Sequence, residues 1–202
     1  KPAIKRDEFL WNINAYGNEL VLSSFPLNLR ATENKIKISA SNKSFELLGE
    51  GKLNNIETKF KIDKLQNTNP SVKINLIESR ELAKYISNIT GQKIDGSASG
   101  LIEINDLDFS NFISKVVIDL DNTRIKLPQF NFSKELGIKG LVKGDFIFES
   151  GLLTKISNFQ GEVGKASFDG KLELKNSFFK EAKFNYISLP GSLISRLDIV
   201  KD

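Results

Sequence analysis

Apolar and polar residues alternate along most of this chain, and two segments show the alternation most clearly. The segments Ile94 to Ile104 and Ile138 to Phe148 begin 44 residues apart and share the pattern apolar-x-Gly-x-(small or apolar)-x-Gly-x-apolar-x-apolar. Their even-numbered side chains are apolar or absent, whereas most odd-numbered ones are polar. A period of two predicts strands with one apolar and one polar face. The motif glycines fall on the apolar face, where they leave room for bending or for another group to approach the backbone.

One segment follows a helical pattern instead. Ser79 is a suitable N-cap, and Gly91 stands where helices commonly end. The apolar residues between them take positions 0, 3, 4 and 7 of a single helical stripe: Leu82, Tyr85, Ile86 and Ile89. A helix of about eleven residues is too short to be stable alone. We therefore expect it to dock this stripe on the sheet, across one end.

Weak internal similarity predicts repeated units. The strand pattern Lys73 to Ile77 and the helical pattern Leu82 to Ile86 resemble Lys183 to Ile187 and Leu193 to Leu197. The regions 44–93 and 165–202 are therefore similar, as are the strand motifs 94–104 and 138–148. We predict a mainly β protein: an elongated, curved antiparallel sheet that forms an open groove from meander repeats, with one or two short capping helices. Residues 1–202 are expected to be a single elongated segment of a larger protein.

Size and hydropathy agree with this prediction. The chain has 202 residues, of which 40% are apolar, and its mean hydropathy is −0.23. No run approaches the roughly 18 apolar residues that a membrane-spanning helix needs. The sequence opens on Lys1-Pro2 without a methionine, so we expect a mature or excised piece of a longer protein, and any membrane anchor of that protein would lie outside this sequence.

Charge is balanced along the chain. The net charge of +4 comes from 29 basic and 25 acidic residues, which are interspersed rather than gathered in blocks. Nucleic-acid binding concentrates Lys and Arg beside exposed aromatic residues, and no such cluster occurs here. We expect no nucleic-acid partner, and we interpret the lysines as the solvated face of the strands.

Residues that usually carry catalysis are scarce. Cysteine and histidine are both absent, which removes thiolate chemistry, the commonest zinc ligand and the commonest general base. The pairs Asp106/Asp108 and Asp119/Asp121 place two carboxylates at i and i+2, but the oxygen ligands and glycine of a calcium loop are missing around them. We interpret these residues as strand faces or turns, and we expect no catalytic activity, no cofactor and no metal site.

The apolar face is therefore the candidate functional surface. Phenylalanine occurs 15 times, against one tryptophan and three tyrosines, which predicts a lining without polar groups. Few large residues per strand suggest one curved sheet rather than two packed ones. The residues expected to line a groove and bind lipid chains are Ile102, Ile104, Ile118, Leu120, Ile125, Leu127, Phe130, Phe132, Phe146, Phe148, Leu172 and Leu174.

The strand motif 94–104 and the run from Ala166 to Leu174 resemble the AsmA-like proteins of Gram-negative envelopes. The resemblance covers roughly residues 44–202 and lies in the pattern, without a catalytic motif. It implies a periplasmic β-groove with a hydrophobic interior, tethered to the inner membrane, that moves phospholipid toward the outer membrane and supports outer-membrane biogenesis. Its implied partners are phospholipid or other acyl lipids, both membranes and other envelope proteins. This chain departs from the family in its short length and in lacking the anchor helix.

A second interpretation stays open at this point. The same one-sided strands would also suit a closed β-sandwich, in which the apolar residues form an ordinary self-filled core. Such a domain would be a structural or protein-interaction module of a bacterial envelope or surface protein. The two interpretations differ in one physical property, which is whether the protein itself covers its apolar face.

Overall fold

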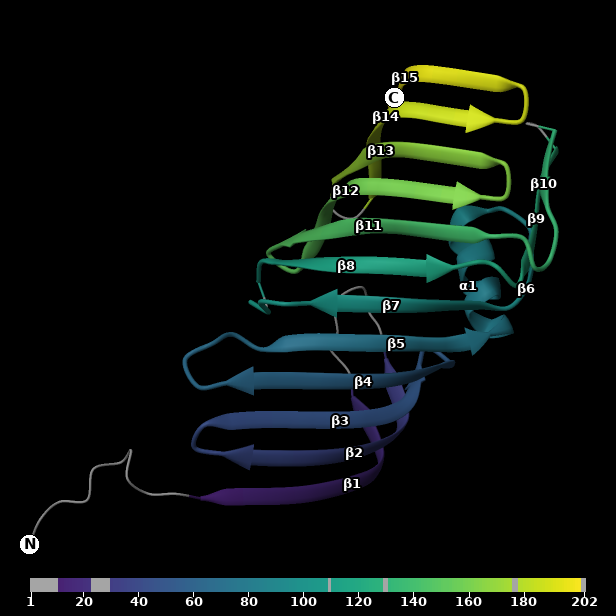
Figure 1. The fold of residues 1–202 in the computed structure, drawn as a ribbon. Helices are drawn as coiled ribbons and strands as arrows, with labels where there is room; N and C mark the ends of the chain where they lie inside the picture. Colours follow the sequence, from purple (N-terminus) through teal and green to yellow (C-terminus); the bar gives the residue numbers. More distant parts are fainter. Residues whose placement is uncertain (1–10, 23–29, 109, 129–130, 176–177, 201–202) are drawn as a thin grey trace, which may run out of the picture.

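A single large antiparallel sheet dominates the computed structural model, which describes residues 11–22, 30–108, 110–128, 131–175 and 178–200. Twelve strands follow one another in the order β1-β2-β3-β4-β5-β7-β8-β11-β12-β13-β14-β15, and β1 and β15 form the two edges (Figure 1). The sheet is curved and does not close on itself, so the predicted fold class is confirmed. Its strands are β1 Asn12–Leu22, β2 Ala31–Ser41, β3 Ser44–Leu53, β4 Ile56–Leu65, β5 Ser71–Ser79, β7 Ala98–Ile104, β8 Phe112–Asp119, β11 Gly140–Glu149, β12 Leu152–Val163, β13 Ala166–Lys175, β14 Phe178–Leu189 and β15 Ser192–Val200.

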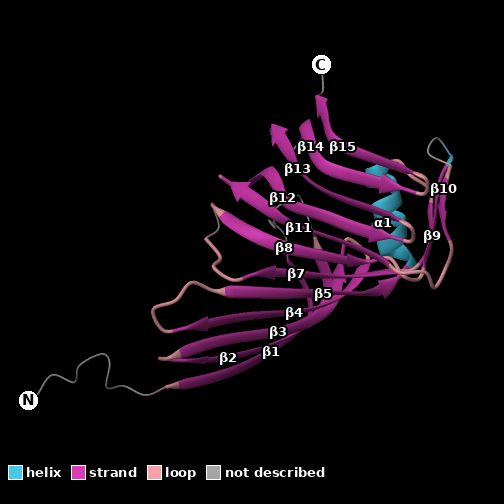
Figure 2. Cartoon of the chain, turned by 45° about the horizontal axis from the view of Figure 1, so that its top comes forward, coloured by secondary structure: helices cyan, strands magenta, loops and turns pink. Residues whose placement is uncertain are grey.

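The remaining elements gather at one end of this sheet. They are helix α1 Arg80–Thr90 and a small sheet of three strands, β6 Ile94–Gly96, β9 Thr123–Leu127 and β10 Phe132–Lys134. In Figure 2 the helix lies behind the main strands, and β9 and β10 run steeply across their ends. The opposite end of the main sheet carries turns and loops, such as those joining β2 to β3 and β4 to β5.

Helix α1 has the predicted boundaries. Ser79 has extended backbone angles, and its hydroxyl accepts a hydrogen bond from the Leu82 amide at 3.2 Å. Gly91 ends the helix with a φ of 67°, a left-handed conformation that glycine adopts without strain. Leu82 docks on the sheet as expected, and so does Ala83, which was not predicted to do so. Tyr85 is more exposed than predicted, and the side chain of Ile89 lies outside the described residues.

Strand pairing separates the two faces cleanly. In the central strands, opposite residues such as Leu47 and Ile62 pair on one face, whereas charged side chains pair on the other. Across this polar face, Lys61 Nζ lies 3.0 Å from Glu46 Oε1, and Lys73 Nζ lies 3.0 Å from Glu103 Oε1. These ion pairs are solvent-exposed and contribute little to stability. They show which face of the sheet is in water.

Two predicted elements differ from the structure. The motif 94–104 is not one strand: it breaks at Gly96, whose φ is 108°, so Ile94–Gly96 joins the small sheet and Ala98–Ile104 the main one. The motif 138–148 lies mostly in one unbroken strand, β11. The second helix is also wrong, because the predicted helical segment 193–197 lies in strand β15. A tight turn at Gly191 folds that strand back onto β14, and the two pair along their length.

Candidate functional site

The candidate site is the apolar face of the main sheet, defined by rows of paired residues that cross it from strand to strand. One such row crosses all twelve strands of the main sheet. Its residues are paired from β1 to β7 and again from β8 to β15. Its members are Ala15, Ile38, Leu47, Ile62, Val72 and Ile104, followed by Ser114, Phe146, Ile156, Leu172, Ala182 and Ile199. Only Ser114 in this row carries a polar side chain. The alternation read from the sequence therefore produces one apolar surface that runs from edge to edge.

One end of this face is covered. Leu82 and Ala83 of α1 are 2% and 1% exposed, and they pack in a cluster with Leu53, Leu76 and Ala98 of the main sheet. The same cluster reaches Val163 and Ala166 at the turn between β12 and β13. The main sheet thus curls around the helix at this end, and the covered end is an ordinary protein core.

Several residues predicted to line a groove lie in this core. Leu120, Ile125 and Phe132 are buried within it, and Leu127 packs against it. Ile125 and Leu127 belong to β9 and Phe132 belongs to β10, so these three residues stand on the small sheet rather than the main one. Ile102 and Ile118 do lie on the main sheet, half-buried, where the covered cluster gives way to the rest of the face.

A second cluster forms near the other end of the strands. The rings of Phe112 and Phe148 stack with centroids 4.4 Å apart, and Leu153 and Ile156 complete the buried part. Of the predicted lining residues, Phe148 is buried here, while four others are half-buried around it: Ile104, Phe146, Leu172 and Leu174. The predicted residue Phe130 lies outside the described residues.

Beyond these clusters the apolar face remains open. Ile38, Leu47 and Ile62 are only half-buried although they sit in interior strands, and they belong to neither cluster. At the edges the exposure increases, with Ile13 of β1 55% exposed and Ile199 of β15 43% exposed. Neither the helix nor the small sheet extends over this region. The described part of the chain therefore leaves a large share of its apolar face in contact with solvent.

Glycines on this face lie beneath phenylalanine rings. Gly49 stands opposite Phe60, and a Cβ on Gly49 would overlap the ring. The same relation joins Gly161 to Phe168, whereas a Cβ on Gly170 would first meet the backbone carbonyl oxygen of Lys183 and then the edge of the Phe184 ring. Phe168 also contacts Phe159 and Phe184, with ring centroids 4.8 Å and 6.2 Å away. The rings of Phe168 and Phe184 meet edge to face, with an interplanar angle of 88°. The sequence analysis missed these pairs, because only the strand register brings each glycine opposite its phenylalanine.

The polar side chains on this face are few, and three of them are buried. Thr58 is buried and donates its hydroxyl hydrogen bond to the Ile56 carbonyl at 2.7 Å. Asn34 and Ser114 are also buried. The described pairs that cross the middle of the face bring no charged side chain to it. The surface thus offers dispersion contacts and desolvation to a ligand, and no group that would fix a charged one.

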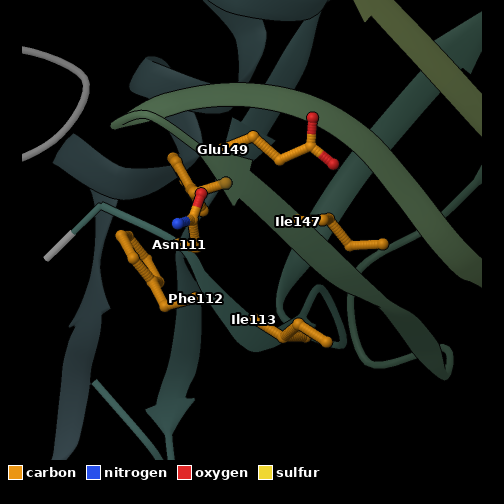
Figure 3. A pocket seen from close by; sticks show the side chains of 6 residues that line it. Asn111, Phe112, Ile113, Ile147 and Glu149 are labelled. Carbon is orange, nitrogen blue, oxygen red and sulfur yellow. The ribbon is translucent and has the colours of Figure 1, made fainter. Parts of the chain in front are cut away.

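Two clefts lie outside this face or at its margin. The first, of about 510 Å³, is at the turn end of β8 and β11 and is lined by Asn111, Phe112, Ile113, Ile147, Phe148 and Glu149. Figure 3 shows Ile113 and Ile147 side by side, pointing away from Phe112. The second, of about 480 Å³, lies mainly on the polar face of β1 to β5, among Lys35, Lys37, Lys59 and Lys61. Neither cleft encloses a set of convergent catalytic groups.

The aspartate pairs act in turns. Asp108 and Asp119 each accept a backbone hydrogen bond two residues on, from Ser110 and Asp121. Asp121 Oδ1 accepts a hydrogen bond from the Gly140 amide at 2.6 Å. Within the described ranges no group of three or more acidic residues is placed to hold a metal ion. Asp108 and Asp119 thus stabilise local turns, and Asp121 ties the turn after β8 to the start of β11.

Lys134 is an unusual buried cation beside this turn. It is 1% exposed, and its Nζ donates to three backbone carbonyls, those of Thr123, Asp121 and Glu135, at 2.8, 3.0 and 3.3 Å. Burial lowers the pKa of Lys134, and the carboxylates of Asp121 and Asp119 oppose that change. The lysine therefore fastens β10 to the end of β9, and no part of it is accessible to a ligand.

Comparison with known proteins finds no matching family model, no matching curated protein and no matching solved structure. In the portion of the chain that the structure describes, no helix has the length and apolar character needed to cross a membrane.

Proposed function

We propose that this chain binds the hydrocarbon chains of lipids along its open apolar face, without catalysing a reaction. In this proposal it is a segment of an AsmA-like protein in the periplasm, which shields phospholipid acyl chains on their way between the inner and outer membranes and so supports outer-membrane biogenesis. One observation carries the proposal: interior strands such as β3 and β4 leave Leu47 and Ile62 half-exposed on a continuous apolar surface.

An acyl chain that leaves a bilayer exposes its methylene groups to water. Each methylene that moves from hydrocarbon into water costs about 0.8 kcal/mol. A chain of about 15 methylenes would therefore lose on the order of 12 kcal/mol if it crossed water unshielded. An apolar face without directional contacts removes much of this cost and lets the chain slide. The phenylalanine rings opposite Gly49 and Gly161 suit that role, because they add apolar contact area without a polar group.

The head group would remain in solvent. The lysines of β2 to β5 stand on the opposite, polar face, apart from Lys64, which lies opposite Phe45 at the turn end of β4. Exposed lysines attract phosphate only weakly, and salt screens that attraction. We therefore expect binding to depend on acyl-chain length and to change little when one phospholipid head group replaces another.

A pair of neighbouring residues provides the test. Phe146 and Ile147 are adjacent in β11 and both half-buried, but they point to opposite faces because strand side chains alternate. The protein is purified from cells, and its co-purified lipid is extracted and identified by mass spectrometry. We expect lipid with the parent chain and with Ile147→Asp, and little with Phe146→Asp. Circular dichroism shows whether each variant has kept its β-structure.

Trp11 gives an independent readout. It is the only tryptophan, it directly precedes β1 and is 39% exposed, and alternation places it on the same face as Ile13. Phospholipid with brominated acyl chains should quench its fluorescence, whereas the same lipid without bromine should not. Absence of extracted lipid, together with unquenched Trp11, would contradict the proposal. It would favour the alternative, a structural or interaction module whose apolar face another protein covers.

A further inference from the structure

The polar face of the main sheet gathers four lysines over β2, β3 and β4. Two neighbouring rows of paired residues each carry a lysine on both outer strands: Lys37 and Lys61 in one row, and Lys35 and Lys59 in the other. Strand spacing and residue rise place their Cα atoms at the corners of a rectangle of roughly 10 by 7 Å. Four ammonium groups are thus held over a small area of the sheet.

The cleft of about 480 Å³ on this face lies between the two rows, and all four lysines line it. Its volume is within the range of ligand pockets, about 300–1,000 Å³. Ile36, Gly49 and Phe60 also line it, although their own positions belong to the apolar face, so the strand backbone forms its floor. The lysines stand one and three strands in from β1, so a further strand beside β1 would extend the sheet without covering the cleft.

Carboxylates neutralise only part of this charge. Two of the lysines take part in ion pairs: Lys61 with Glu46 and Asp63, both at 3.0 Å, and Lys35 with Glu50 at 3.9 Å. In the described ranges of the chain, no carboxylate forms an ion pair with Lys37 or Lys59. Of the residues that line the cleft, four are cations and one, Glu50, is an anion. Lys37 and Lys59 therefore have their charge available for a ligand.

Lysines adjacent to the cleft are closely paired. Lys73, the next residue after Lys61 in its row, lies 3.0 Å from Glu103, and Lys52 lies 2.7 Å from Glu33. The excess of positive charge is therefore confined to the cleft. A broad anionic surface such as a membrane would meet these carboxylates as well, whereas a compact anionic ligand would meet mainly lysines.

The uncharged groups of the cleft are suited to hydroxyl groups. Asn18 and Asn75 line it, and a side-chain amide both donates and accepts hydrogen bonds, as a sugar hydroxyl does. Tyr16 lines it beside Lys37, with which it is paired. A tyrosine ring offers an apolar surface with a polar group at its end, and the C–H groups of a sugar ring can pack against such a surface.

We propose that this cleft binds an acidic glycan, a chain of sugars that carry carboxylate groups, and that Lys37 and Lys59 hold those carboxylates. Ammonium groups, amides and an aromatic ring together match the carboxylates, hydroxyls and C–H faces of such a chain. The cleft and the apolar face lie on opposite sides of the sheet. The glycan is therefore a second ligand, and its binding does not depend on lipid.

Oligogalacturonate, a glycan whose sugars each carry a carboxylate, is the probe, and an uncharged maltooligosaccharide of equal length is its control. Each is titrated into the full chain at low salt while amide resonances are followed by NMR. We expect the acidic glycan to shift the amides of Ile36, Gly49 and Phe60, and the neutral one to leave them nearly unchanged. Absence of binding by oligogalacturonate would overturn the proposal.

Two double variants separate a specific site from general charge attraction. Lys37→Gln/Lys59→Gln should weaken glycan binding by up to roughly fivefold for each lysine, the range for exposed charge pairs. Lys84→Gln/Lys126→Gln makes the same change in net charge at exposed positions of α1 and β9, and it should bind like the parent chain. Equal losses in the two double variants would overturn the proposal. Trp11 quenching by brominated lipid should stay unchanged in both, so lipid binding is tested separately.

Tyr16 distinguishes a glycan from other anions. Tyr16→Leu should weaken oligogalacturonate binding, whereas Tyr16→Phe keeps the ring and should retain most of it. Inorganic triphosphate and phosphatidylglycerol vesicles are titrated alongside. If either shifts the same amides more strongly than the glycan does, and Tyr16→Leu has no effect, the cleft binds a different anion and the assignment to an acidic glycan is wrong.

Discussion

The two ends of the apolar face use the same alternating sequence pattern for different purposes. Around α1, Leu76 of β5 and Ala98 of β7 are almost fully buried and form a core with Leu82 of the helix and with residues of the small sheet. In β3 and β4, Leu47 and Ile62 occupy equivalent positions on strands but remain half-exposed. The difference lies in two excursions of the chain, 80–97 and 120–139, which return over one end only. Alternation thus makes a surface apolar, and a separate segment decides whether that surface becomes a core.

The largest expected effect comes from a leucine-to-alanine substitution in the covered region, compared with the same substitution in the open region. Leu82→Ala removes a side chain that is 2% exposed, so it should leave a cavity and lower the free energy of unfolding by about 2–5 kcal/mol. Leu47→Ala trims a half-exposed side chain and should cost less than about 2 kcal/mol, because little of its surface leaves water on folding. Chemical denaturation of both variants measures the difference.

Equal losses at the two positions would contradict the comparison. They would mean that the open region is covered in solution, either by a partner copy or by a bound lipid that survives purification. Repeating the denaturation with delipidated protein separates these cases. Lipid removal should leave the Leu82→Ala effect unchanged in either case.

The sequence predicted part of the covered end, namely the boundaries of α1, and missed the rest. Ser79 and Gly91 determine the boundaries of α1 through their own backbone preferences, so the sequence revealed them. The break at Gly96 was missed because it depends on residues distant in sequence: Ser97 donates a backbone hydrogen bond to the Asn122 carbonyl, and Ile94 pairs with Ile125. That pairing also explains why Ile125 and Phe132, although they alternate like lining residues, lie in the core.

The alternation of the main strands was predicted better, because one face of a long meander needs no distant partner. The period of two placed Ile104, Phe146 and Leu172 on the apolar face, where the pairing puts them. The misread segment was 193–197, whose apolar spacing fits a helical turn as well as a bulged strand. Only the ladder with β14 decides between the two, and a ladder cannot be read from one strand alone.

The next largest effect is expected from removing the hydrogen bonds by which Lys134 holds β10 against β9. Lys134→Met keeps much of the side-chain volume but leaves three backbone carbonyls without their ammonium donor, which should cost about 1–3 kcal/mol. Hydrogen exchange should accelerate in β9 and β10 and stay unchanged in β3 and β4. Lys126→Met, on an exposed residue of β9, is the matched control and should have no measurable effect.

The same variant should alter the pH dependence of stability. The folded state lowers the pKa of Lys134, so between that pKa and the ordinary lysine value the unfolded chain holds more protons. Stability therefore rises with pH in this alkaline window, and the contribution is absent below it. The free-energy difference between the parent chain and Lys134→Met should widen as pH rises through the window. A difference that narrows there would show that the charged form is the one the fold prefers.

The smallest expected effect tests whether the missing side chain of Gly161 makes room for the Phe168 ring on the apolar face. Gly161→Ala places a methyl group where the Phe168 ring now lies, and overpacking of this kind costs about 1–3 kcal/mol. We expect the lower end, because a ring on an uncovered surface can lift toward solvent, but a lifted ring would obstruct a sliding acyl chain. Lipid capture should therefore fall more than stability does. In the double variant Gly161→Ala/Phe168→Leu the smaller side chain relieves the overlap, so both losses should shrink together, a coupling that a double-mutant cycle measures. If the two substitutions act independently, the position of the Phe168 ring does not depend on Gly161.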